Sequence, residues 1–299
     1  MKHRAGFTRR GFAGRATGML FVLPAAIVII LMMVYPLIQV IIFSFSKVKL
    51  PFFELEYIGL KNYIDVITPA SFMTIIRNTL LWTIITLVMR FLLGLTSALI
   101  MDTKMIGRKP FRIITLLPWV LPQIVTANIW RWLYNPENGL INSVLKSINP
   151  DLALNWLGSR DTALLSVVLT NIWMGFPFLM LMMLAGMQGI PKDYTEAAKI
   201  DGANAIQVFF HITLPSLKNI MIILAILEFI NGFNSFDLLF VMTGGGPGIS
   251  SEILGLFIYR TAFSNFNFGQ SSATGMILII AIGIFFLFYA PSTRKRGDN

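Results

Sequence analysis

Six long apolar segments limit what this chain can fold into more than any other feature of its sequence. Four of them contain no charged residue at all, at positions 16–46, 113–130, 162–191 and 261–293. Two further apolar stretches are interrupted only by Arg90, or by Glu228 and Asp237. About 20 apolar residues are enough to cross a bilayer, so each segment can hold one membrane helix. With 56% hydrophobic and 13% charged residues, the chain lies far outside the range of soluble globular domains.

Each segment is expected to be helical, because a backbone in lipid has to satisfy its own hydrogen bonds. The sequence therefore predicts an all-α integral membrane protein with one transmembrane domain at 18–291, between a basic tail at 1–17 and a second tail at 292–299. The first segment runs well past the length of a signal-peptide core, so an uncleaved anchor is expected. The six predicted spans are 18–43, 78–101, 113–134, 163–186, 219–242 and 272–289.

The distribution of basic residues predicts the orientation. Fifteen Lys and Arg residues lie in the two tails and in the second-to-third and fourth-to-fifth connections, against seven in the other three connections. Because Lys and Arg are enriched on the cytoplasmic side, both termini and the loop at 187–218 are predicted to be cytoplasmic. The net charge of +10 then reflects topology and contacts with anionic membrane lipid, and no nucleic acid partner is expected.

No group of residues in the sequence is suited to catalysis. The two histidines, His3 and His211, stand alone, and no His or carboxylate cluster has metal-ligand spacing. The glycine-rich run at 244–247 lacks the Lys and Ser or Thr of a phosphate-binding loop, and the chain has no cysteine. We therefore expect no catalytic residue, no metal site and no directly bound cofactor. Transport would be passive, ion-coupled or driven by a separate ATPase.

The most specific pattern lies between the fourth and fifth spans. From the residues alone, Pro191 can open a helix over 192–201, Gly202 permits a turn, and 203–212 can form a second short helix before the fifth span. An ordinary amphipathic loop helix is the alternative interpretation. Seven positions match the pattern Glu-Ala-Ala-x3-Gly-x9-Ile-x-Leu-Pro, namely Glu196, Ala197, Ala198, Gly202, Ile212, Leu214 and Pro215. This segment resembles the cytoplasmic coupling loop of permease subunits in binding-protein-dependent ABC importers.

Further short motifs extend the resemblance over nearly the whole chain. They are Leu23-Pro24, Tyr35-Pro36, Ser44-Phe45, the run 59–63, Leu117-Pro118-Trp119 with Pro122, the run 171–177, Phe236-Asp237 and the run 243–247. In this order and spacing they are similar to the carbohydrate-uptake permeases, on the side of the maltose-transporter-type first permease subunit. The resemblance implies the type I ABC importer permease fold, with a coupling loop that docks on an ATPase subunit.

The resemblance also implies partners and a location. It implies a non-catalytic subunit that pairs with a second, homologous permease as a heterodimer. Two ATPase subunits would bind ATP and Mg²⁺, and an extracytoplasmic solute-binding protein would deliver a sugar or sugar derivative. The location implied is the inner (cytoplasmic) membrane of a bacterial or archaeal cell, and the external loops, including 59–63 and 243–247, would meet the binding protein.

Polar and aromatic residues recur at helical spacing in three predicted spans, where such residues usually face a cavity or another helix. Aromatic rings stack on sugar rings, while amides and carboxylates bind hydroxyl groups, so these stripes suit a sugar path. The alternative is that they are helix-packing contacts. The predicted path residues, which also match where the maltose-type subunit holds its sugar, are Trp119, Gln123, Asn171, Gly175, Phe178, Glu228, Gly232 and Ser235; Asn231 joins them by spacing alone.

Arg90 and Glu228 are the charges deepest in the predicted bilayer. A lone charge there costs at least about 2.5–3.5 kcal/mol on insertion scales, so each needs a partner. One hypothesis pairs them with each other across the second and fifth spans. Another has Arg90 bind an acidic group on the substrate. The rival function is an ion-coupled secondary transporter, in which Arg90, Glu228 and Asp237 would form a relay; the internal repeats and broken helices common in such proteins are not evident in the sequence.

Overall fold

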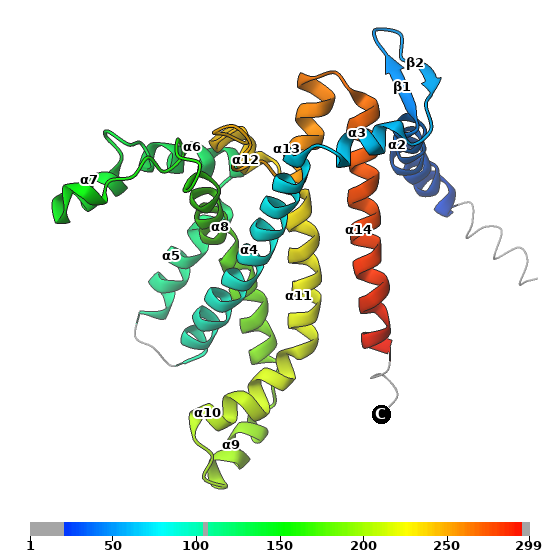
Figure 1. The fold of residues 1–299 in the computed structure, drawn as a ribbon. Coiled ribbons are helices and arrows are strands. Elements are labelled where there is room, and N and C mark those ends of the chain that lie inside the picture. The colour runs from blue at the N-terminus through cyan, green and yellow to red at the C-terminus, as the bar shows by residue number, and fades with distance from the viewer. Residues whose placement is uncertain (1–20, 104–106, 295–299) are drawn as a thin grey trace, which may run out of the picture. The chain divides into compact units, whose positions relative to one another are not determined.

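The computed structural model describes residues 21–103 and 107–294, so the whole predicted basic tail at 1–17 and most of the predicted tail at 292–299 lie outside the described residues. The chain forms two compact units, one made of residues 1–66 and 261–299 and the other of residues 67–260 (Figure 1). Within the described residues the structure is helical apart from one two-stranded hairpin, in agreement with the predicted all-α fold.

The first unit combines the beginning and the end of the chain. Its first helix spans Phe21–Ser44 and contains a π-helical turn, η1 (Ile30–Val34), followed by α2 (Tyr35–Ser44). A hairpin follows, in which β1 (Ser46–Lys49) pairs antiparallel with β2 (Glu54–Tyr57). The unit is completed by α3 (Lys61–Ile67), most of η4 (Arg260–Ser264) and α14 (Phe268–Arg294), which packs along α2.

Asn62 holds the first unit together where α2 meets the hairpin. Its Nδ2 donates to the carbonyl oxygens of Ser44 at 3.0 Å and of Ser46 at 2.9 Å. A Cβ at Gly269 would lie 2.6 Å from the Ser46 carbonyl oxygen, so only glycine lets α14 approach so closely. All nine predicted path residues lie in the second unit.

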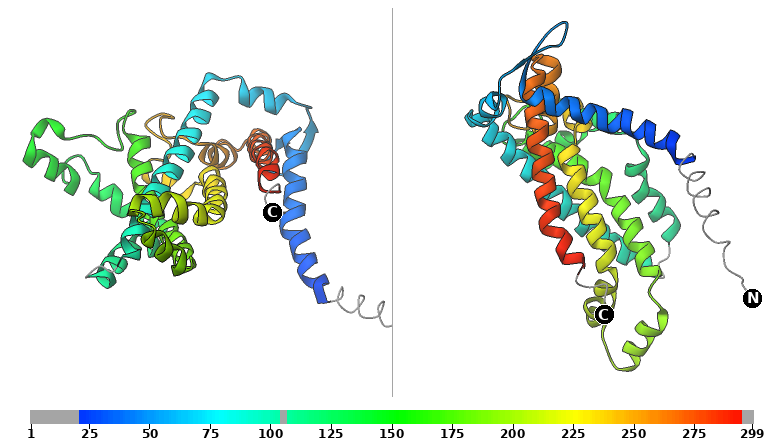
Figure 2. Two further views of the ribbon diagram at one scale, coloured as in Figure 1. Left: turned by 90° about the horizontal axis from the view of Figure 1, so that it is seen from below. Right: turned by 90° about the vertical axis from the view of Figure 1, so that its right-hand side faces the viewer.

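The second unit is built around three long helices, α4 (Ala70–Asp102), α8 (Ala163–Gln188) and α11 (Leu214–Asn234). Each of these helices packs against the other two, and α5 (Arg108–Val120) packs on α8. Two short helices, α9 (Lys192–Ile200) and α10 (Ala205–Val208), lie at one end of this bundle in the views of Figures 1 and 2. The remaining elements are α6 (Gln123–Leu133), α7 (Leu140–Ile148), η2 (Pro150–Leu152), η3 (Phe209–Thr213), α12 (Asp237–Met242) and α13 (Leu254–Tyr259).

Four helices in the described residues are long and apolar enough to cross a membrane, at Phe21–Ser44, Ala70–Asp102, Ala163–Gln188 and Ala205–Phe233. They coincide with the predicted first, second, fourth and fifth spans. The predicted sixth span, 272–289, falls within α14, and no charged residue interrupts that helix before Arg294. Helix α14 continues to Arg294, beyond the predicted boundary at 291. The predicted fifth span ends early, because Ser235 is extended and α12 begins as a separate helix at Asp237.

The prediction of a single helix over 113–134 was wrong. Helices α5 and α6 are separate and meet at an angle of 101°, so the expectation of no broken helices also fails. Leu121 is extended, with φ −72° and ψ 136°, and Pro122 follows it. A proline disfavours the helical region for the residue before it and has no N–H to continue the ladder. Counted as one bent span, the pair brings the number of candidate spans to five.

Two apolar clusters form the core of the second unit. One contains Trp82 of α4 with Val167 and Ile172 of α8, and the other contains Met101 of α4 with Leu179 of α8. Each of the three long helices contributes one member of a buried polar group, in which Arg90 of α4 contacts Asn171 of α8 and Glu228 of α11. This polar layer inside an apolar bundle marks the candidate site.

Candidate functional site

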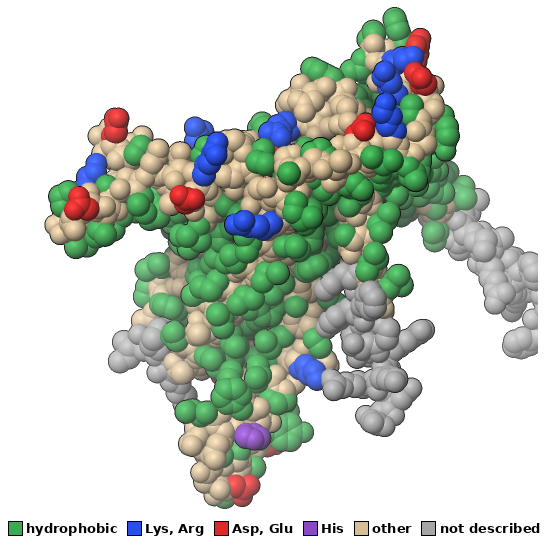
Figure 3. All heavy atoms as spheres, in the orientation of Figure 1, with side chains coloured by type: hydrophobic (Ala, Val, Ile, Leu, Met, Phe, Trp, Pro, Cys, Tyr) green, Lys and Arg blue, Asp and Glu red, His purple; other side chains and the backbone are tan. Residues whose placement is uncertain are grey.

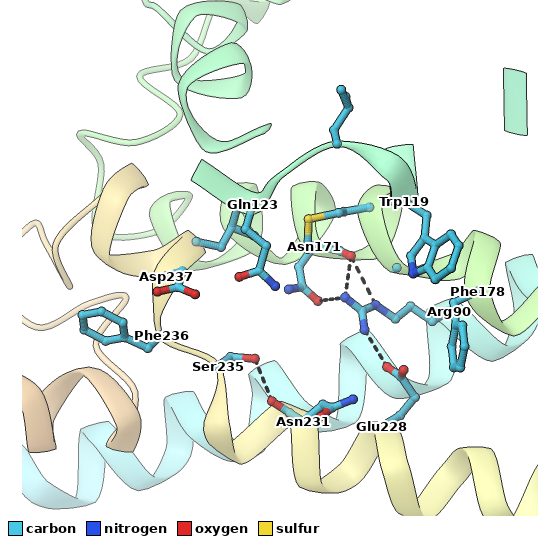
Figure 4. Close-up of a pocket in the computed structure, with 14 residues that line it drawn as sticks. Arg90, Trp119, Gln123, Asn171, Phe178, Glu228, Asn231, Ser235, Phe236 and Asp237 are labelled. Carbon is cyan, nitrogen blue, oxygen red and sulfur yellow. Dashed lines mark hydrogen bonds and ion pairs between the residues drawn. The ribbon is translucent and has the colours of Figure 1, made fainter. Parts of the chain in front are cut away.

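A cavity of about 510 Å³ opens beside the polar layer in the second unit (Figure 4). Eight of the nine predicted path residues line it: Trp119, Gln123, Asn171, Gly175, Phe178, Glu228, Asn231 and Ser235. The ninth, Gly232, is not among the lining residues. The cavity volume lies within the range of small-molecule sites, and its lining combines aromatic faces with amides and charges, as such a site requires. A role for these residues in substrate passage stays a prediction.

Arg90 is the centre of the hydrogen-bond network on the cavity wall. Its Nη1 lies 2.5 Å from Oε2 of Glu228, which forms the predicted ion pair between α4 and α11. Its Nη2 donates to the Asn171 carbonyl oxygen at 2.8 Å and to Oδ1 of the same residue, and its Nε donates to that carbonyl at 3.2 Å. Arg90 is 9% exposed and Glu228 6% exposed, so the guanidinium is engaged on both sides and largely removed from solvent.

The two path glycines act at helix crossings. A Cβ on Gly175 would lie 2.0 Å from Cζ of Arg90, so glycine is what gives the guanidinium room against α8. A Cβ on Gly232 would lie 2.7 Å from Cγ2 of Thr83, where α11 crosses α4. For Gly232, the alternative interpretation as a packing residue therefore fits the geometry better than a place on the cavity wall.

Aromatic side chains form the other wall of the cavity. The rings of Trp119 on α5 and Phe178 on α8 are stacked, with centroids 5.9 Å apart and planes inclined by 27°. Trp119 remains 48% exposed, so part of its ring is accessible beside the stacked pair. The break after α5 is what separates Trp119 from Gln123, which stands at the beginning of α6. Trp119 and Gln123 both line the cavity, as predicted. They do not share one helix face, so the spacing of four residues was the wrong reason for the prediction.

Six lining residues lie outside the predicted path: Arg90, Leu121, Met174, Phe236, Asp237 and Leu238. Arg90 was predicted to pair with Glu228 or to bind an acidic substrate group, and Phe236-Asp237 was predicted only as a motif and an intramembrane charge. Met174 lies three residues after Asn171 on α8, so helical spacing was a signal for it. Leu121, Phe236 and Leu238 lie at helix breaks, and their positions follow from backbone bends that an apolar pattern does not reveal.

The segment matching the importer pattern forms two helices at one end of the bundle. Glu196 and Ala197 are exposed on α9, and Ala198 is half-buried. Ile212 and Leu214 are half-buried beside the start of α11, and Pro215 is exposed in its first turn. Between α9 and α10 lies a groove of about 280 Å³, lined by Ala198, Asp201, Gly202, Ala203, Gln207, Val208, His211 and Ile212.

Gly202 ends α9 in the manner the sequence predicts. It has φ +86°, in the left-handed region that favours glycine. Its N–H donates to the Lys199 carbonyl at 3.1 Å, and the N–H of Ala203 donates to the Ala198 carbonyl at 2.9 Å. These two bonds make a Schellman cap, which stops the helix and reverses the chain.

The second helix of this segment differs from its prediction. Asn204 and Gln207 form a reciprocal capping box that starts α10. The helix then continues without a break through the π-helical turn η3 into α11, as one helix over Ala205–Phe233. The N–H of Leu214 donates to the Phe209 carbonyl, five residues back. Insertion of this π-turn lets the helix pass Pro215, so α10 and the membrane-spanning helix form one continuous element.

A polar cluster fixes the loop that contains the glycine-rich run. Asn78 of α4 donates to the carbonyl oxygens of Ile249, Ser250 and Glu252, each at 3.1 Å. The Glu252 side chain is fully buried, and its Oε2 lies 2.8 Å from Nη2 of Arg260. Burial raises the pKa of Glu252 to about 7, and the Arg260 charge opposes this shift without cancelling it. Neither Asn78 nor Glu252 was predicted from the sequence to be a functional residue.

Comparison with known proteins identifies the family. The model of the family described as "binding-protein-dependent transport system inner membrane component" matches residues 90–290, which include the cavity, the importer pattern and the glycine-rich loop. The chain belongs to this family. It is therefore a multi-pass membrane permease component of a binding-protein-dependent ABC transporter, as the resemblance in the sequence indicated. Membership also decides against the ion-coupled secondary transporter as its function.

Individual relatives cover most of the chain. The trehalose/maltose transport system permease protein MalF of Thermococcus litoralis is 33% identical over 284 residues, which are 94% of this chain and 95% of that protein. The sulfoquinovosyl glycerol transport system permease protein SmoG of Agrobacterium fabrum is 35% identical over 88% of this chain and 86% of its own length. A bacterial alginate ABC transporter, solved in complex with its pentasaccharide-bound periplasmic protein, shares the fold, with a TM-score of 0.86, 19% identity, and coverage of 98% of this chain and 99% of that one.

Proposed function

We propose that this chain is one half of the translocation path of an ATP-driven sugar importer. The observation that carries the proposal is the cavity in which eight predicted path residues meet, in a chain whose relatives are named for trehalose, maltose and sulfoquinovosyl glycerol. The stacked pair Trp119 and Phe178 would face a sugar ring, and Gln123 and Asn231 would bind hydroxyl groups. The substrate is a sugar or sugar derivative delivered by an extracytoplasmic binding protein.

The proposed topology has six spans, with the bent pair α5–α6 as the third and α14 as the sixth. Both termini and the α9–α10 end would face the cytoplasm, as the distribution of basic residues predicts. The loop held by Asn78 would then be external, where it would meet the binding protein together with residues 59–63. The membrane is the inner membrane of a bacterial or archaeal cell.

Helices α9 and α10 would dock on an ATPase subunit. Tyr194, Ile200, Ile206 and Phe210 expose large apolar surfaces around the groove, which suits a protein contact more than contact with water. A continuous helix from Ala205 into the membrane gives the docked end a direct mechanical connection to Glu228 on the cavity wall. Closure of two ATPase subunits around ATP and Mg²⁺ would tilt this helix, and a second, homologous permease would complete the path.

Reconstitution of the complete transporter tests the proposal. The complex of both permeases and the ATPase, in proteoliposomes with its binding protein, should take up radiolabelled trehalose or maltose only when ATP is enclosed on the ATPase side. Trp119→Ala should reduce uptake at saturating binding protein, whereas Leu92→Ala, on an exposed stretch of α4, should not. Uptake without ATP, or by this chain without an ATPase subunit, would refute the proposed mechanism.

A further inference from the structure

Helix α7 carries an apolar stripe on its exposed side. Leu140, Val144 and Ile148 recur every fourth residue, and their exposed fractions are 55%, 52% and 73%. Residues four apart lie on the same face of a helix, so the three side chains form one row. Lys146 and Ser143 fall outside this row. The exposed surface of α7 therefore has an apolar side and a polar side.

The stripe belongs to a well-fixed element. The buried side chain of Asn142 donates to the carbonyl oxygens of Pro136 and Leu154, at 3.2 and 2.8 Å, and its Oδ1 accepts from Nε1 of Trp156 at 2.8 Å. Ile141, one residue earlier, packs against the apolar cluster of the second unit. The orientation of α7 is therefore set from its inner side, and the row of Leu140, Val144 and Ile148 is held outward.

Aromatic residues surround the chain segment that leads into and out of α7. Trp130 contacts Tyr134 and Trp173, with ring centroids 5.3 and 5.4 Å apart, and Tyr134 contacts Trp156 at 5.5 Å. Trp132 is 62% exposed. Trp130, Tyr134 and Trp156 pack in the protein core, whereas exposed Trp side chains gather at the boundary between the bilayer and water, so Trp132 indicates the level of the lipid headgroups. In Figure 1, α6 and α7 lie at the end of the α4–α8 bundle opposite α9 and α10.

Charge on and near α7 is sparse, with two acidic residues and one basic residue. Glu137, Lys146 and Asp151 are exposed, and Nζ of Lys146 donates to the Pro136 carbonyl at 3.3 Å, away from the apolar row. In Figure 3 hydrophobic side chains lie along the lower edge of the arm that carries α7, on the side of the apolar belt of the bundle. Three side chains are also far fewer than the roughly 20–30 residues per side of a stable protein interface.

We propose that α7 is an interfacial helix, with the row of Leu140, Val144 and Ile148 immersed at the boundary between lipid headgroups and acyl chains. Burial of apolar area holds it there, and the lack of an excess of basic residues gives no attraction to anionic lipid. This inference needs only the membrane location that family membership establishes. In the proposed topology the helix lies in the outer leaflet, where it braces the bend between α5 and α6.

The absence of cysteine from this chain allows a direct test by site-directed spin labelling. Single variants Val144→Cys and Ile148→Cys on the row, and matched controls Ser143→Cys and Lys146→Cys off it, would carry a nitroxide. The complete transporter, with cysteine-free partner subunits, would be placed in phosphatidylcholine nanodiscs. Power saturation would then compare collisions of each label with oxygen, which dissolves in lipid, and with a water-soluble nickel chelate.

The expected result is an alternation along the helix. Oxygen should dominate at positions 144 and 148, and the nickel chelate should dominate at 143 and 146. Dominance of the nickel chelate at all four positions would show that the row faces water and would overturn the proposal. Low collision rates with both reagents at 144 and 148 would show a covering protein, such as the second permease, and would overturn it equally. Monodisperse elution of each labelled complex confirms assembly, since all four side chains are exposed.

Discussion

The ion pair between Arg90 and Glu228 gives the sharpest test of the site. The perturbations are Glu228→Gln, Arg90→Met and the two together. Both side chains are almost fully buried, and Nη1 and Oε2 lie 2.5 Å apart, so each charge depends on the other. Removing one partner leaves an uncompensated charge in an apolar bundle, whereas removing both leaves no charge to desolvate.

The structure sets the order of the three losses. Breaking a buried pair by removing one partner costs about 3–5 kcal/mol of unfolding free energy. Glu228→Gln should lie near the lower value, because Asn171 still accepts hydrogen bonds from Arg90 through two oxygen atoms. Arg90→Met should lie near the higher value, because it leaves the Glu228 carboxylate without its cation. The double variant should cost less than either single change, so the coupling energy of the pair should exceed about 3 kcal/mol.

Unfolding in mixed micelles by added dodecyl sulfate, followed by tryptophan emission, measures these free energies. A matched control is Leu92→Met on the exposed side of α4, where little change is expected. Additive losses in the double variant would refute the claim that each residue mainly neutralises the other. Intact stability of Glu228→Gln together with new uptake of an acidic sugar would instead support the hypothesis that Arg90 binds an anionic substrate.

Three other changes test separate parts of the second unit. Gly175→Ala should destabilise the bundle by about 1–3 kcal/mol, because its Cβ would overlap the Arg90 guanidinium. Gly275→Ala is the control and should cause little loss, because the space around its Cβ is open. The same dodecyl sulfate titration compares the two variants. Gly202→Asp should strain the cap of α9 by about 1–2 kcal/mol, because residue 202 has φ +86°. The variant should still insert into the membrane but lose ATP hydrolysis stimulated by the binding protein. Unchanged stimulation would contradict the coupling role. Because the pKa of Glu252 rises to about 7 on folding, the folded state binds the extra proton, so unfolding free energy should fall as pH rises from about 4.5 to 7 and level off above. Glu252→Gln should remove this fall, and an identical pH profile in the variant would assign it to other groups.

Spacing along single helices predicted much of the cavity correctly. Asn171, Gly175 and Phe178 all lie on one continuous helix, so a period of 3.6 residues was enough to place them on one face. The same argument failed for Trp119 and Gln123, which lie on either side of a break. The dipeptide Leu121-Pro122 indicated a break, because a proline disfavours the helical conformation of the residue before it. The absence of charged residues over 113–130 favoured a single span instead.

The cap and turn chemistry of the segment around Gly202 was also local and therefore predictable. A glycine in the left-handed region after a helix needs no tertiary contact to end it. The continuation of α10 through η3 into α11 was not predictable, because Pro215 usually marks a helix start. Only the packed structure shows that a π-turn lets the helix pass it.

The sequence was sufficient to show that the chain is a membrane protein, roughly where it crosses the bilayer, and which segment matches the importer pattern. These features depend on apolar length and motif spacing, which can be measured along the chain without knowing how it folds. The tertiary structure alone decided that Arg90 faces Glu228 rather than open space, that Gly232 packs against Thr83, and where the third span bends. These outcomes depend on the relative rotation and approach of helices far apart in the chain. Apolar faces fit together in several rotations at similar free energy, and specific close contacts select one of them.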